Sequence, residues 1–396
     1  MRVFVSDAHS RAALQIIRSL GSRGIEVYTG EHFKITPSYF SRYVSGYFVY
    51  PNPKTEPKKF VLELNNYCVK NNIEVIIPVV DDVYNAIGYY RDFFSKNIKI
   101  PIIEYKKFLM ARDKLETMRI CEKLDIPHPK THFSKDLDIN HIKKEFNLPI
   151  ILKPRKSSGS RGISVIKKWQ TLEKEFERIS KKYGTPMIQE YIPHGGAYGV
   201  EVLYNRGRML RSFTHKRIRE FPEGGGPSTV RISTHREDIE KIAKKLMDYL
   251  GWHGVAMVEF RIHKETGLPY VMEINPRYWG SLRLAIASGY DIPFAHYRMA
   301  IGENVSPDFM YKESVIARWL LFGDILWFLT SKNENKFKEF FIYFFKRNVY
   351  YDNITSKDPL PALGAFIEAL HFLLDKKKRE YALNRGLDVD DNKRDQ

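Results

Sequence analysis

Two glutamates and an asparagine in the second half of the chain are spaced to hold a metal ion. In residues 254–277, two runs of alternating apolar and polar residues flank a turn, which predicts a β-hairpin with a glycine in the left-handed conformation. If the turn is centred near Thr266, Glu259 faces Glu273, and Asn275 projects from the same side. Opposed like charges destabilise a sheet unless a cation lies between them, and Mg²⁺ binds carboxylate and amide oxygens of this kind. The spacing favours a magnesium site over the alternative, a solvated acidic patch.

A loop of small residues, SSGSRG at 157–162, could bind phosphate. Its glycines allow close backbone approach, and its amide and hydroxyl groups can surround phosphate oxygens. Lys153 ends the strand before this loop, and Lys114 follows Asp113 at the first position of an expected helix, so both are expected to point at the same phosphates. A mobile turn with solvated lysines is the alternative for each feature alone.

Two further segments carry candidate binding groups. The apolar segment 187–193, MIQEYIP, is expected to end a strand and present backbone groups to an adenine, although an ordinary strand end has the same pattern. Residues 213–233 place several cations beside a glycine hinge at 224–226, which suits the clamping of a carboxylate or phosphate. A basic surface loop is the alternative; we favour a functional role for two of its cations, Lys216 and Arg231.

The elements that must position these groups follow from periodicity. Residues 1–105 alternate short apolar runs with helical patterns, which indicates a parallel α/β sheet, but the first turn lacks GxGxxG and so no dinucleotide fingerprint is present. Asp81 and Asp82 follow an expected strand, either as ligand contacts or, preferably, as helix caps. The main expected elements are strands at 2–5, 25–28, 74–80, 131–133, 150–153, 163–166, 187–190, 199–204 and 208–215, and helices at 12–20, 57–71, 83–95, 113–124, 139–146, 171–183, 237–250 and 362–374.

Composition limits the function classes. The 396 residues carry 64 basic and 47 acidic side chains, a net charge of +17 that favours anionic partners. No zinc-finger or RNA-recognition pattern is found, so nucleic acid is not expected. Only Cys68 and Cys121 are present, and the start has no signal-peptide layout, so we expect a cytoplasmic protein. The aromatic and basic segment 327–345 is either an interfacial helix for peripheral membrane contact or, preferably, a packed helix.

Together these features resemble the ATP-grasp family, in its carbamoyl-phosphate-synthase-like or carboxylate–amine ligase branch, over about residues 106–302. The E-I-N-P-R sequence at 273–277 and its distance from Glu259 are the most specific features. The resemblance implies an ATP site with Mg²⁺ (or Mn²⁺), in which Glu259, Glu273 and Asn275 hold metal and Arg277 faces the phosphoryl group. The implied nucleotide contacts are Lys114, Lys153, Ser158, Gly159, Ser160, Gly162, Gln189, Glu190, Tyr191, Ile192 and, near the ribose or base, Glu201.

The resemblance also implies fold and activity. We expect an α/β and α+β chain: a parallel N-terminal α/β domain (1–105), a two-lobed ATP-grasp domain (106–302, lobes about 125–190 and 191–302), and a helical aromatic and basic region (303–396). The implied activity is ligation of a small-molecule carboxylate to an amine through an acyl phosphate, releasing ADP and phosphate, with catalytic roles for Arg277, Lys216 and Arg231. Alternatives are a carboxyphosphate- or carbamoyl-phosphate-forming enzyme and a non-catalytic nucleotide-binding module. The substrates and the oligomeric state, a homo-oligomer included, stay open.

Overall fold

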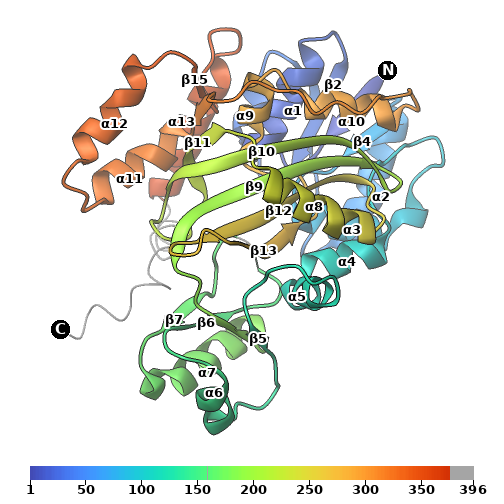
Figure 1. Cartoon of the computed structure of the whole chain (residues 1–396). Helices are drawn as coiled ribbons and strands as arrows, with labels where there is room; N and C mark the ends of the chain where they lie inside the picture. Colours follow the sequence, from blue (N-terminus) through green and yellow to red (C-terminus); the bar gives the residue numbers. More distant parts are fainter. Residues whose placement is uncertain (158, 375–396) are drawn as a thin grey trace.

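The computed structural model describes residues 1–157 and 159–374, which form three β-sheets covered by helices (Figure 1). The N-terminal sheet is parallel, as the sequence predicts, and its strands follow the order β3-β2-β1-β4, of which β3 was not predicted. Apolar side chains of β1 are fully buried, and α1 begins where the Ser10 side chain accepts a hydrogen bond from the Ala12 amide (3.2 Å). The elements are β1 (Arg2–Val5), α1 (Arg11–Gly21), β2 (Glu26–Glu31), β3 (Val44–Val49), α2 (Pro57–Lys70), β4 (Val75–Ile77), α3 (Asp81–Tyr89) and α4 (Tyr105–Arg112).

A small antiparallel lobe lies at the bottom of Figure 1. Its four strands follow the order β5-β8-β6-β7, and two helices bury Ile142, Phe176 and Ile179 against them. The amphipathic spacing of these residues places every buried side chain on the helix faces that meet the sheet. The elements are β5 (Thr131–His132), α6 (Ile139–Glu145), β6 (Ile150–Lys153), β7 (Ser164–Ile166), α7 (Leu172–Tyr183) and β8 (Met187–Glu190), with α5 (Lys114–Lys123) leading into the lobe.

A seven-stranded sheet forms the centre of the molecule, in the order β13-β12-β9-β10-β11-β14-β15. One face packs on α8, through side chains such as Val200 and Val258. The opposite face packs at one end on α1, α9 and α10, through Leu203 and Met257, and carries Glu259 further along. The elements are β9 (His194–Asn205), β10 (Arg208–Glu220), β11 (Ser228–Ser233), α8 (Glu237–Tyr249), β12 (Gly254–His263), β13 (Pro269–Asn275), α9 (Leu282–Ala287) and α10 (Ile292–Ala300).

The region after residue 302 contributes helices, as expected, and also two short strands that the sequence analysis did not predict. These strands extend the central sheet beyond β11, so this region shares a sheet with the preceding one. The predicted domain boundaries at 105 and 302 stay predictions, and the tail 375–396 lies outside the described residues. The elements are β14 (Ile316–Arg318), a π-helical turn (Leu320–Asp324), α11 (Ile325–Thr330), α12 (Lys336–Phe345), β15 (Val349–Tyr351) and α13 (Leu360–Leu374). Within the described chain, every helix is too short or too polar to cross a lipid bilayer.

A buried charge cluster joins this last region to the N-terminal domain. Arg231 of β11 is fully buried and forms an ion pair with Asp352, which also binds Arg11 of α1 (Nη1 to Oδ2, 2.6 Å). Burial favours the neutral acid, but the charges of Arg231 and Arg11 outweigh it and hold the pKa of Asp352 below its ordinary value. Asp352 is therefore a charged link between three distant segments.

We expect Asp352→Ala to lower the free energy of unfolding by about 3–5 kcal/mol, because it leaves Arg231 and Arg11 buried without their counter-ion. Denaturant titration of the full chain measures the change. Glu26→Ala is the control: it breaks the exposed Arg2–Glu26 pair, and a loss below about 1 kcal/mol is expected. Equal effects of the two substitutions would contradict a role of Asp352 in stability.

Candidate active site

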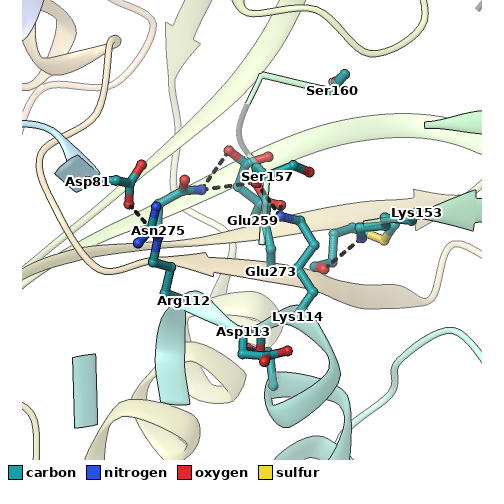
Figure 2. Close-up of polar contacts among 12 residues, drawn as sticks. Asp81, Arg112, Asp113, Lys114, Lys153, Ser157, Ser160, Glu259, Glu273 and Asn275 are labelled. Carbon is teal, nitrogen blue, oxygen red and sulfur yellow. Dashed lines mark hydrogen bonds and ion pairs between the residues drawn. The ribbon is translucent and has the colours of Figure 1, made fainter. Parts of the chain in front are cut away.

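The two glutamates face each other across the β12–β13 hairpin. Glu259 and Glu273 are direct partners in the register, and Gly267 of the turn has a left-handed φ of 70°, so the predicted hairpin geometry is confirmed. The Asn275 Nδ2 donates hydrogen bonds to Glu259 Oε1 (3.0 Å) and Glu273 Oε1 (3.2 Å) (Figure 2). The three predicted metal ligands thus converge on one point of the sheet face.

Basic side chains compensate the two carboxylates. Lys114 Nζ lies 3.1 Å from Glu273 Oε2, and Arg217 Nη2 lies 2.8 Å from Glu259 Oε1. Burial raises the pKa of Glu273, but the nearby charges of Lys114 and Lys153 exceed that effect, so its pKa lies below the ordinary value. Glu273 is therefore ionised, and the hard oxygen atoms of the two carboxyl groups, together with the Asn275 amide, suit a divalent cation such as Mg²⁺.

Two lysines from different elements reach the same strand. The Asp113 carboxylate accepts a hydrogen bond from the Leu115 amide (3.1 Å), which caps α5 and places Lys114 at its first position, as predicted. Lys153 ends β6, is 4% exposed, and donates to the Met272 carbonyl oxygen (3.1 Å), one residue before Glu273. Figure 2 shows the Lys114 ammonium group beside the two glutamates, with Lys153 on the other side of Lys114.

The small-residue loop contacts the glycine turn of the basic segment. Gly159, Ser160 and Gly162 all have positive φ, and Ser160 Oγ donates a hydrogen bond to the Gly225 carbonyl oxygen. Lys114 Nζ also donates to the Ser157 carbonyl oxygen, so the loop begins next to the lysine. Ser158 lies outside the described residues. The role of this loop as a phosphate lid stays a prediction.

The segment expected to contact adenine leaves the small lobe at the end of β8. Gln189 and Ile192 are buried, and Glu190 and Tyr191 are partly exposed. The Glu190 amide donates to the Lys130 carbonyl oxygen (3.0 Å), so this N–H already has a partner, and contact with adenine stays a prediction.

Glu201 lies on the same sheet face as Glu259 but is enclosed. Its Oε1 accepts a hydrogen bond from Ser281 Oγ (2.8 Å) and lies 3.0 Å from His215 Nδ1, and the side chain is fully buried. It lies two positions along β9 from Gly199, the register partner of Glu259. The structure thus places Glu201 near the carboxylate pair, while its contact with ribose or base stays a prediction.

Arg277, two residues after β13, connects this strand to the N-terminal domain. Its Nη2 donates to Asn275 Oδ1 (3.0 Å) and its Nε to Asp81 Oδ2 (2.8 Å). The prediction that Asp81 caps α3 is wrong, because Val80 occupies the cap position and the Asp81 carboxylate binds arginines instead. The position of Asp81 at the carboxyl end of a parallel strand was the available signal for this role.

Lys216 and Arg231 are not brought to the carboxylate pair. Successive residues of β10 point to opposite faces, so Lys216 lies over the Tyr198 ring (5.9 Å) on the far side, and Arg217 takes the position beside Glu259. Arg231 shares the face of Arg217, but its guanidinium group is directed at Asp352. The catalytic roles of Lys216 and Arg231 stay predictions, and Arg217 is the cation of this segment that the structure places beside Glu259.

Comparisons with known proteins agree with this geometry. Residues 111–281 match the ATP-grasp domain family model. The chain is 27% identical over 223 residues to a D-alanine–D-alanine ligase of Flavobacterium psychrophilum, covering 52% of this chain and 67% of that protein. It is 21% identical over 254 residues to a carbamoyl-phosphate synthase of Methanobrevibacter smithii, covering 61% and 65%. The chain thus spans about two thirds of the length of these relatives.

A solved structure supports the fold. The Campylobacter jejuni biotin carboxylase in its β,γ-ATP complex superposes with a TM-score of 0.66 at 17% identity, covering 80% of this chain and 74% of that one. The family match includes Lys114, Lys153, the hairpin and Arg277, which are the residues that meet at the carboxylate pair. Residues 111–281 of this chain therefore belong to the ATP-grasp domain family.

Proposed function

We propose that the chain is an ATP- and Mg²⁺-dependent ligase that activates a carboxylate as an acyl phosphate and joins it to an amine, releasing ADP and phosphate. One observation carries the proposal: the carboxyl groups of Glu259 and Glu273 and the Asn275 amide converge with two lysines that come from other elements. In a solvated acidic patch the neighbouring lysines would be exposed, whereas Lys153 is only 4% exposed. The relation to a D-alanine–D-alanine ligase supports the carboxylate–amine chemistry.

The position of each residue around the carboxylate pair indicates its role in the proposed reaction. Glu259, Glu273 and Asn275 would hold Mg²⁺, which supplies charge neutralisation for the phosphate oxygens. Lys114, now paired with Glu273, would turn to the phosphates, since it is adjacent to both the carboxylate and the small-residue loop. Arg277 would face the transferred phosphoryl group while Asp81 holds its orientation. The loop over the site would exclude water from the acyl phosphate.

The electrostatics of Lys153 give the proposal a pH dependence. Burial lowers the pKa of Lys153 to about 8, and the opposing attraction of Glu273 only partly compensates. Only the protonated ammonium group attracts phosphate. The site is therefore prepared for an anion below this pH and loses one positive charge above it.

A second candidate is a carboxyphosphate- or carbamoyl-phosphate-forming enzyme, which the relation to a carbamoyl-phosphate synthase favours. The two chemistries share the ATP site and differ in the acid that is phosphorylated, bicarbonate in one case and an organic carboxylate in the other. Bicarbonate-dependent phosphate release would identify the second candidate. Nucleotide binding without phosphate release from any acid would identify a non-catalytic module.

Phosphate release from ATP should depend on one class of acid and on Glu273. We expect a panel of amino acids, each paired with amino acids or ammonia, to give at least one active pair. Hydroxylamine should trap the acyl phosphate as a hydroxamate. Glu273→Gln removes a metal-ligand charge at nearly constant size and should abolish both products, while Glu26→Gln on the surface should not. Unchanged release by the Glu273 variant would contradict the metal assignment.

ATP affinity should fall as the pH rises through about 8, because Lys153 then loses its proton. Calorimetric titration with a non-hydrolysable ATP analogue and Mg²⁺ measures this, and buffers of different ionisation enthalpy should show proton uptake on binding. Lys153→Arg keeps its charge and should flatten the profile. An affinity of the wild-type chain that is constant between about pH 7 and pH 9 would refute the role of Lys153.

Arg217 and Lys216 provide a matched pair of neighbouring cations on opposite faces of β10. We expect Arg217→Ala to reduce phosphate release by about a hundredfold, because Glu259 loses its buried partner, and Lys216→Ala to have little effect. Steady-state rates with an active substrate pair measure both. A larger loss in the Lys216 variant would show that the face assignment is wrong.

A further inference from the structure

Helix α12 exposes an apolar face to the solvent. Among its residues, Phe340 and Tyr343 are buried, but Phe345 is 85% exposed and Phe337 is 61% exposed, and Phe341 and Phe344 are each 47% exposed. At about 100° per residue, these four phenylalanines and the exposed Ile342 occupy one continuous arc of roughly 160°, in which Lys338 is the single charged residue. The expected packed helix is thus packed on one side only.

The exposed area is large for a surface helix. Taking about 200 Å² for each aromatic side chain, the four phenylalanines present on the order of 500 Å² to water. Leu329 of α11 (66% exposed) and Ile342 (37% exposed) add to it. Apolar patches of this size are at the upper end of what monomers keep without a binding role. We call the six residues Leu329, Phe337, Phe341, Ile342, Phe344 and Phe345 the aromatic face.

Positive charge surrounds the aromatic face. Lys332, Lys338, Lys346 and Arg347 are exposed, and among the described residues none of the four forms an ion pair with a carboxylate. Of the two acids of residues 325–347, Glu334 is exposed and Glu339 lies 3.6 Å from Arg219, so the four cations outnumber the carboxylates around them. Figure 1 shows α11 and α12 at one extremity of the molecule, away from the small lobe. A flat anionic surface could therefore meet this face without obstructing the site.

We propose that α11 and α12 dock the protein on an anionic lipid surface, with the aromatic face in the headgroup region and the four cations on lipid phosphates. Interfacial helices combine such an aromatic side with lysine and arginine, and their binding adds buried apolar area to electrostatic attraction. The net charge of +17 attracts the same surface at long range.

Vesicle sedimentation of the full-length chain tests the proposal. We expect co-sedimentation with vesicles of phosphatidylcholine and phosphatidylglycerol in equal parts, weaker binding at high salt, and little binding to phosphatidylcholine alone. Hydrogen exchange of the bound protein should slow in α11 and α12 and not in the small lobe. The triple substitution Phe337→Ser, Phe341→Ser and Phe345→Ser should reduce the lipid partition coefficient at least about tenfold.

Val69→Ser, Leu268→Ser and Met310→Ser form the control triple, since these side chains are exposed to a comparable degree on other elements. It should bind vesicles like the wild type, and both triples should keep nucleotide binding. Absence of wild-type binding to anionic vesicles would overturn the proposal. A second result would also overturn it: the wild type is a dimer in light scattering, does not bind vesicles, and becomes a monomer only with the aromatic-face triple substitution. The aromatic face would then be an interface between copies of the chain.

Discussion

The opposition of Glu259 and Glu273 on one sheet face is the constraint to which the rest of the site responds. Two carboxylates at a register pair repel each other, and each is balanced by a cation from a different part of the chain, Lys114 from α5 and Arg217 from β10. The Asn275 amide donates to both. In the proposed function, a divalent cation at the same point would take the place of the Lys114, Arg217 and Asn275 donors. Lys114 would then be free to leave Glu273.

Local patterns made the hairpin and the convergence of its polar side chains predictable. The period-two alternation determines which residues face each other, and the Asp113 cap determines where α5 begins, so Glu259, Glu273, Asn275 and Lys114 follow from neighbouring residues alone. The parallel N-terminal sheet follows from the alternation of strands and helices for the same reason.

Features that depend on distant segments were not predictable in this way. The regular pairing of β10 with β9 and the packing of α8 on one face decide that Arg217, and not Lys216, points at the carboxylates. The Asp81–Arg277 pair joins residues 196 positions apart, and β14 has only three residues, too few for a periodic signal. Periodicity also cannot tell which side of an apolar helix such as α12 lacks a neighbour.

The shared central sheet limits how this chain can be dissected. Pairing with β14 covers the outer edge of β11, and Asp352 beyond it compensates Arg231 and Arg11. A fragment ending near residue 302 would expose the backbone of β11 as a new sheet edge, which promotes aggregation. It would also leave the guanidinium groups of Arg231 and Arg11 without a counter-ion. A fragment starting near residue 106 would remove Asp81 from Arg277. The smallest unit fit for expression therefore runs from the first strand to at least β15.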